Sequence, residues 1–238
     1  MRKWATLALL CFACGANAHD LITAEAAERY LKNASRWHDE SITAGAVRTR
    51  AQAHVKIGAM LDEIRELLNR DLAMHGQVQG LASNFLVSEL QRLGTPLAYS
   101  ESRTFFLANS SHYRTALGLG LTGPLGREAK LRLLRGDFYD SFEFDPLQTT
   151  QTWEQLQGQV ALADDLVETT GSEPNREEVR FIATFLYARA AHLAPDVNLA
   201  GDFRTRAIML SESFEREYPD SMRGAAMPIV RDALLALD

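Results

Sequence analysis

The stretch Phe214-Glu-Arg-Glu-Tyr218-Pro219-Asp220-Ser221 decides the fold. An apolar stripe at helical spacing leads into it, and Pro219 forces the residue before it out of helical geometry. Ser221 is a favourable N-cap for a following helix, and the small residues 224–226 allow that helix to approach the first one closely. The stretch therefore predicts a helix, a sharp turn and a second helix.

A similar outline lies upstream, in residues 152–194. Thr152 and Gln155 form a capping-box pair, and apolar residues follow at steps of three and four. Asn175 with Glu178 is a second pair of this kind, ahead of the next apolar stripe. Two successive helical hairpins are therefore expected in the C-terminal half.

The Tyr-Pro-x-Ser turn and the small-residue helix after it resemble the hairpins of tetratricopeptide-like envelope proteins, of the outer-membrane assembly lipoprotein and cell-division coordinator types. The resemblance covers residues 203–237 and implies an αα-hairpin unit. Two features depart from the family pattern. The hairpins are longer than the tetratricopeptide unit, and Pro228 falls inside the second helix, where it should kink the helix or delay its start.

The N-terminal half is also predicted to be helical. A stripe from Ala27 to Trp37 is interrupted by the polar run 38–41, and a long helix follows from about Thr43 to Leu72. Its charged and polar positions, among them Asp62, Asn69 and Asp71, are expected to face water. Shorter helices follow, whereas residues 95–110 show no lasting period and are expected to form a loop on the core.

No segment shows sustained strand alternation. The expected class is therefore all-α, with antiparallel helical hairpins that either stack as a TPR-like array or pack as an irregular helical bundle. Residues 19–238 are expected to form a single all-helical domain, with 19–123 and 124–238 as an alternative division into two sub-arrays.

Residues 1–18 have the pattern of a cleaved secretory signal peptide, with a basic start, a short apolar run and a small-x-small site at residues 16–18. This pattern predicts a periplasmic protein. Both cysteines, Cys11 and Cys14, lie in this segment, so the mature chain would lack cysteine. Lipidation of Cys14 is the alternative. No later run reaches 18 apolar residues, so no membrane span is expected.

The charge of the chain argues against two classes of partner. The formal net charge is −6, and removing residues 1–18 takes away two basic and no acidic residues, which leaves −8. Binding to nucleic acid or to an anionic membrane surface requires concentrated Lys and Arg. The sequence contains no such cluster, so neither partner is expected.

Cleavage after residue 18 would place His19 at the N-terminus. A free amine beside its own imidazole is a copper-chelating pair, and a second histidine would have to complete the site. None of the remaining histidines is spaced from another as a helical ligand pair; they are His38, His54, His75, His112 and His192. An incidental histidine at a cleavage site is the competing interpretation, and the primary expectation is no cofactor.

The segment 136–146 is dense in aromatic and acidic residues. A solvated helix end beside buried Phe138, Tyr139 and Phe142 is the main interpretation. If the segment has a function, it is predicted to be a partner-binding patch, because exposed aromatics rimmed by charge suit protein contacts. The predicted residues are Asp137, Phe138, Tyr139, Asp140, Phe142, Glu143 and Asp145.

The sequence contains no serine-nucleophile elbow, phosphate loop or dinucleotide fingerprint, so catalysis is not favoured. We therefore expect a periplasmic binding or scaffolding protein for another cell-envelope protein or peptide. A small-ligand or copper-binding periplasmic protein is the first alternative, and an enzyme with an uncharacterised site is the second.

Overall fold

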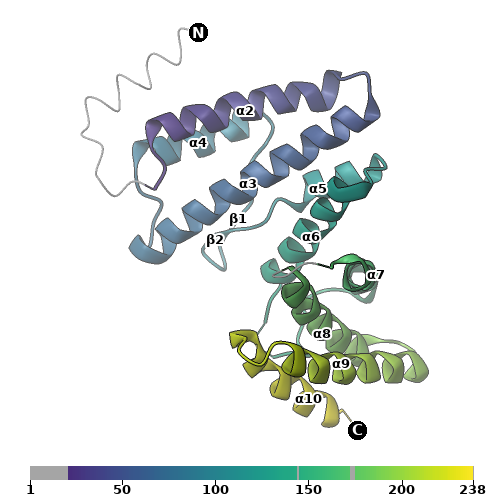
Figure 1. Ribbon diagram of the computed structural model, residues 1–238. Helices are drawn as coiled ribbons and strands as arrows, with labels where there is room; N and C mark the ends of the chain where they lie inside the picture. The colour runs from purple at the N-terminus through teal and green to yellow at the C-terminus, as the bar shows by residue number, and fades with distance from the viewer. Residues whose placement is uncertain (1–20, 144, 172–174, 238) are drawn as a thin grey trace. The chain divides into compact units, whose positions relative to one another are not determined.

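A computed structural model describes residues 21–143, 145–171 and 175–237 of the chain. The predicted signal peptide, Cys14 and His19 lie outside these residues. The described chain is all-α apart from one two-stranded hairpin, as the sequence predicted (Figure 1). Two compact units divide between Ala129 and Lys130. Among the described residues, no helix combines the length and apolarity that crossing a membrane would require.

The first unit is organised around its longest helix, α3 (Val47–His75). α3 packs against α2 (Ala24–Thr43), α5 (Ser110–Gly118) and the strand β2 (Phe105–Phe106), and α2 also packs against α4 (Leu81–Arg92). The predicted first hairpin, α2 with α3, is therefore confirmed (Figure 1). Its core is aliphatic, with Leu31, Ile57, Leu61, Ile64, Leu68, Leu86 and Leu90 all fully or nearly fully buried.

The predicted interruption at residues 38–41 was wrong. α2 continues through this run to Thr43, and the backbone N–H of Ala44 still bonds to the carbonyl of Glu40. Polar side chains do not end a helix unless they compete for the backbone or cannot adopt helical dihedrals. The predicted N-cap is confirmed, since the Thr23 side chain accepts a hydrogen bond from the N–H of Ala26 at 3.2 Å.

The expected water-facing side of α3 also needs correction. Asp62 is buried and accepts a hydrogen bond from the Tyr113 hydroxyl at 2.6 Å. Asn69 forms two hydrogen bonds with the backbone of Phe106, and Asp71 is buried beside His75. α3 is covered on several sides, so polar residues outside its apolar stripe are buried and need partners there.

The segment 95–110, in which the sequence shows no lasting period, contains a short antiparallel hairpin. β1 (Tyr99–Ser100) pairs with β2, so that Tyr99 lies opposite Phe106. Thr104 has a φ of 57° in the connecting turn. Phe106 is buried against the core, which agrees with the expectation of a loop on the core but adds a strand pair that the sequence did not predict.

The second unit is organised around α8 (Asn175–Leu193). It contains the end of α6 (Gly123–Asp140), followed by α7 (Trp153–Thr169), α8 and α9 (Val197–Glu217). α8 packs against α7, α9 and α10 (Met227–Leu235). Every residue from Phe181 to Ala191 is buried, as expected for a helix that is covered on all sides. The capping box of Thr152 and Gln155 is confirmed at the start of α7.

The C-terminal turn follows the prediction closely. The backbone of Tyr218 is no longer helical, and the Ser221 hydroxyl accepts a hydrogen bond from the N–H of Arg223 at 3.1 Å. A 3₁₀ segment, η1 (Met222–Ala226), comes before α10, and Pro228 lies in the first turn of α10. Of the two expectations for Pro228, the delayed start is therefore the one observed, because the first turn tolerates a missing N–H.

Candidate functional site

The predicted partner-binding residues lie at the end of α6 and on the segment that follows it. Phe138 is fully buried, and Phe142 is partly buried against the same core. Phe138 therefore does not belong to an open surface patch, because the interior of the second unit covers it. Tyr139 is 39% exposed, and Asp145 is also exposed. The buried Phe138 agrees with the interpretation of this segment as a helix end beside buried aromatics, whereas Tyr139 is more exposed than that interpretation implied.

The buried aromatics form one cluster with two phenylalanines of α8. The ring centroid of Phe138 lies 5.3 Å from that of Phe142, 5.9 Å from Phe185 and 6.1 Å from Phe181. The rings meet edge-on or tilted, the geometry that aromatic pairs prefer. Phe142 is the one member of this four-ring cluster that is only partly buried.

Arg189 lies at the edge of this cluster and is the largest fully buried side chain in the described chain. Its guanidinium carbon is 5.4 Å from the centroid of Phe138, in cation–π geometry. Among the described residues, none provides a hydrogen bond to its Nε, Nη1 or Nη2. Burial lowers the pKa of Arg189 to about 10, and the nearby carboxylates of Glu143 and Asp145 oppose this shift. The group therefore stays charged at neutral pH, and it is buried without a hydrogen bond to any of the described residues.

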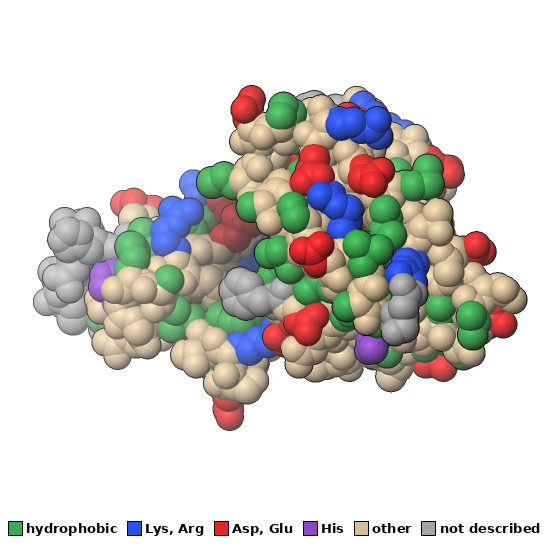
Figure 2. Space-filling model, turned by 90° about the horizontal axis from the view of Figure 1, so that it is seen from below, with side chains coloured by type: hydrophobic (Ala, Val, Ile, Leu, Met, Phe, Trp, Pro, Cys, Tyr) green, Lys and Arg blue, Asp and Glu red, His purple; other side chains and the backbone are tan. Residues whose placement is uncertain are grey.

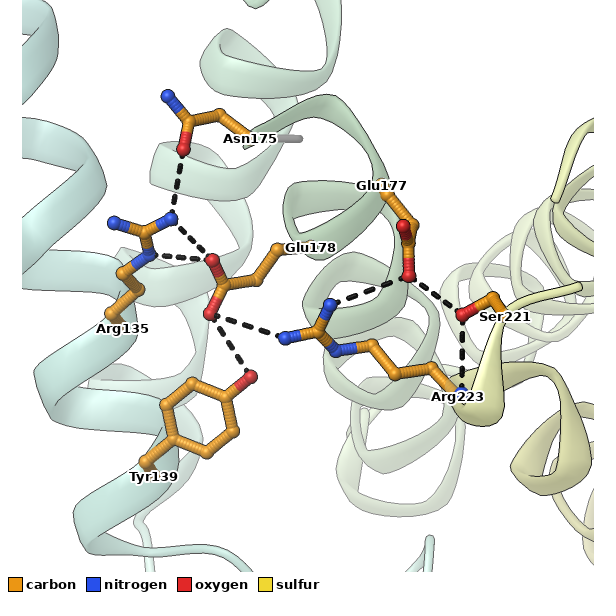
Figure 3. A network of polar contacts seen from close by, with 7 residues as sticks. All are labelled: Arg135, Tyr139, Asn175, Glu177, Glu178, Ser221 and Arg223. Atoms are coloured by element: carbon orange, nitrogen blue, oxygen red, sulfur yellow. Dashed lines mark hydrogen bonds and ion pairs between the residues drawn. The ribbon is translucent and has the colours of Figure 1, made fainter. Parts of the chain in front are cut away.

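A network of ion pairs surrounds the first turn of α8 (Figure 3). Glu178 accepts hydrogen bonds from Arg135 Nε at 2.7 Å and from the Tyr139 hydroxyl at 3.1 Å. Its neighbour Glu177 accepts from the Ser221 hydroxyl at 2.6 Å and from Arg223 Nη1 at 3.3 Å.

The two glutamates thus connect α8 to different parts of the unit. Arg135 on α6 also donates to the side-chain oxygen of Asn175 at 2.9 Å, and Arg223 reaches Glu178 at 3.8 Å (Figure 3). Burial raises the pKa of the Tyr139 hydroxyl, and the Glu178 carboxylate raises it further while Arg223 opposes the shift. Each charge in the network has a partner of opposite charge, so we interpret the network as structural.

An open cleft of about 480 Å³ lies on the C-terminal hairpin. Glu212, Glu215 and Arg216 of α9 line one side, and Arg231 of α10 lines the other. Arg231 donates to Glu215 at 2.6 Å. The cleft is therefore lined by side chains of both charges.

The first unit brings two of the predicted histidines together. The Nδ1 atoms of His54 on α3 and His112 on α5 are 3.1 Å apart, so one ring donates a hydrogen bond to the other. Burial lowers the pKa of His54, with the charge of His38 as the second cause. Burial also lowers the pKa of His112 to about 4, with contributions from His54 and His38. Both rings are therefore neutral at neutral pH.

Of the other histidines, His38 acts electrostatically on both rings of this pair. His75 lies 2.9 Å from the Asp71 carboxylate, and His192 is exposed in the last turn of α8. Across residues 21–143, 145–171 and 175–237, no group of three or more His, Cys, Asp or Glu side chains has the arrangement of a metal site. His19, the predicted copper ligand, lies outside these residues.

Arg189 was missed at the level of sequence, although a signal was present. It is the only charged residue in the run Phe181-Ile-Ala-Thr-Phe-Leu-Tyr-Ala-Arg-Ala-Ala191. A single charge inside a long apolar run indicates a buried ion, whereas the lack of a hydrogen-bond partner can be read only from the structure.

No protein-family model matches the chain, and no curated protein or solved structure shows significant similarity to it. The resemblance of the C-terminal hairpin to tetratricopeptide-like envelope proteins therefore stays a prediction.

Proposed function

We propose that the protein is a binding or scaffolding module of the periplasm that holds a segment of another cell-envelope protein or a peptide. The periplasmic location rests on the signal-peptide pattern of residues 1–18. The mode of action rests on the helical-hairpin architecture and on the surface of the last hairpin.

The observation that carries the proposal is the apolar flank of the cleft between α9 and α10. Met209 is three residues before Glu212 and seven before Arg216, so it lies on the face of α9 that lines the cleft. Leu235 follows Arg231 by four residues on α10, so it lies on the same face as Arg231, one turn further along the helix. Met209 is 64% exposed and Leu235 is 58% exposed. In stacked-hairpin proteins, such an outer face is covered by a further repeat or by a partner.

The charge pattern supports a protein or peptide partner. Figure 2 shows acidic and basic side chains interspersed with apolar ones on the face that it presents. The cleft itself contributes two glutamates and two arginines. A surface of this kind suits an interface with an apolar centre and a polar rim, whereas a polyanion would require a dominant basic field.

Crosslinking in an envelope extract tests the proposal. The double variant M209E/L235E places charge on the apolar flank, and I42E is its matched control, because Ile42 is 63% exposed but lies on α2. We expect the wild-type chain and I42E to capture the same partner and M209E/L235E to lose it. Equal capture by all three chains would refute a binding role for this cleft.

A second candidate function is the binding of a small ligand within the second unit. The specific observation in its favour is Arg189, a buried charge whose hydrogen-bonding capacity is unused by the described residues. Native proteins pair nearly all such groups, and an exception suggests a role other than stability.

A further inference from the structure

The environment of Arg189 is costly for the folded state. A guanidinium carries five N–H donors, and removing it from water without replacing those hydrogen bonds is strongly unfavourable. The cation–π contact with Phe138 offsets only a fraction of this cost. An apolar side chain of the same length would therefore be expected to leave the fold as stable or to stabilise it.

The chemistry of the guanidinium specifies one part of a ligand. Its planar fork donates two parallel hydrogen bonds to one carboxylate, a geometry that no other cationic side chain offers. A carboxylate is therefore the group that satisfies the unused donors of Arg189.

The charges around Arg189 specify a second part. Glu143 and Asp145 both act on Arg189 electrostatically, and the three side chains together carry a formal charge of −1 before a ligand binds. A simple anion would increase this negative charge, whereas a zwitterion would leave it unchanged. An ammonium group close to the ligand carboxylate would also be attracted by these two side chains. The electrostatics thus favour a ligand head that carries both charges.

The cluster of phenylalanine rings specifies the remaining part of the ligand, its apolar group. Arg189 lies over Phe138, and the partly buried ring of Phe142 packs against the same ring. An apolar group on the ligand could take the place of the Phe142 ring against Phe138 and Phe185, since Phe142 also lies 5.5 Å from Phe185. This exchange would bring the ligand head to the guanidinium.

We propose that Arg189, Glu143 and Asp145 bind the zwitterionic head of an α-amino acid whose side chain is apolar. The guanidinium holds the carboxylate, the two acidic side chains attract the ammonium, and the phenylalanine cluster receives the side chain. This inference rests on the second candidate function, the binding of a small ligand, and does not depend on the cleft between α9 and α10.

Calorimetric titration with L-phenylalanine tests the proposal, with 3-phenylpropionate and phenethylamine as probes that lack the ammonium and the carboxylate, respectively. We expect L-phenylalanine to bind at least about tenfold more tightly than either probe, the factor that corresponds to losing one charged hydrogen-bonding group. Equal binding of 3-phenylpropionate would overturn the role of Glu143 and Asp145. The absence of any binding would overturn the whole site.

Two variants separate ligand binding from folding. R189M should abolish the binding of L-phenylalanine and unfold at the same temperature as the wild-type chain or higher. R206M is the matched control, since Arg206 also lies over an aromatic ring, at 4.2 Å from the Tyr187 centroid, but is paired with Asp164. R206M should retain binding and unfold at a lower temperature. A loss of stability in R189M that exceeds the loss in R206M would make Arg189 a structural residue and refute the proposal.

A third variant, F142A, keeps the test independent of how R189M folds. Removing the ring that the ligand displaces should tighten the binding of L-phenylalanine, whereas unchanged or weaker binding would exclude this route to Arg189. Crosslinking through the α9–α10 cleft should proceed equally in R189M and in the wild-type chain, so a failure of the amino-acid site and a failure of the scaffolding function give different results.

Discussion

Acidification is expected to destabilise the first unit through His54 and His112. The pKa of His112 is lowered from 6.5 to about 4 in the folded chain, first by burial and then by the neighbouring histidines. Because the folded-state pKa lies below the unfolded value, the unfolded chain binds the proton more strongly between these two pH values. The stability contributed by the neutral ring is therefore complete above pH 6.5 and is lost as the pH falls toward 4.

The size of the effect follows from the same shift. At 1.36 kcal/mol per pKa unit, His112 alone accounts for a loss of about 2 kcal/mol by pH 5 and about 3 kcal/mol by pH 4. The pKa of His54 is lowered as well, which acts in the same direction. At a separation of 3.1 Å, the two Nδ1 atoms can share one proton but cannot both carry one.

The assay is urea unfolding at several pH values, followed by the fluorescence of Trp37 on α2. The chain contains three tryptophans, Trp4, Trp37 and Trp153. Starting the chain at His19 and changing Trp153 to Phe leaves Trp37 as the single probe of the first unit. H112Q is the comparison, since an amide still bonds to His54 but does not titrate. The free energy of unfolding of the chain with His112 should fall about 2 kcal/mol further than that of H112Q between pH 7 and pH 5, and parallel curves would refute this reasoning.

Two further perturbations test the packing of the first unit. A Cβ at Gly58 would lie 2.7 Å from Cζ of Tyr113, so G58A should destabilise the unit by about 1–3 kcal/mol in chemical unfolding. The matched change is G158A, because no atom of a packed neighbour lies within 4 Å of a Cβ added there, and it should stabilise the second unit by about 0.5–1 kcal/mol. Equal effects of the two changes would contradict the packing argument. N69A removes both hydrogen bonds to the backbone of Phe106 and should lower the free energy of unfolding by about 1–3 kcal/mol. Hydrogen exchange at the Phe106 amide should then become faster. Unchanged protection would show that the β-hairpin does not depend on this side chain.

Local signals in the sequence were sufficient for the helical class and for several helix ends. Thr23, Thr152 and Ser221 cap the helices or turns that they were expected to cap. Each of these interactions joins residues two or three apart, so the information is contained in a short stretch. The delayed start of the last helix at Pro228 is local in the same sense.

Long-range contacts account for what the sequence did not show. Asp62 was expected to face water, but it is buried because Tyr113, 51 residues further along, packs across α3. The pairing of His54 with His112 spans 58 residues. The burial of Phe138 was the favoured expectation, but the rings that enclose it, Phe181 and Phe185 of α8, could not be identified from its neighbours in sequence. In each case a helix from elsewhere in the chain determines the environment.

The burial of α8 on all sides has a consequence for the motions of the second unit. Its central amides, from Phe181 to Ala191, can exchange with solvent only when most of the unit opens, so they should be the slowest to exchange and should report its global stability. Arg189 belongs to this slowest segment. Occupancy at its guanidinium would therefore be visible as additional protection along α8 as a whole, and hydrogen exchange of one helix would serve as a gauge of ligand binding deep in the unit.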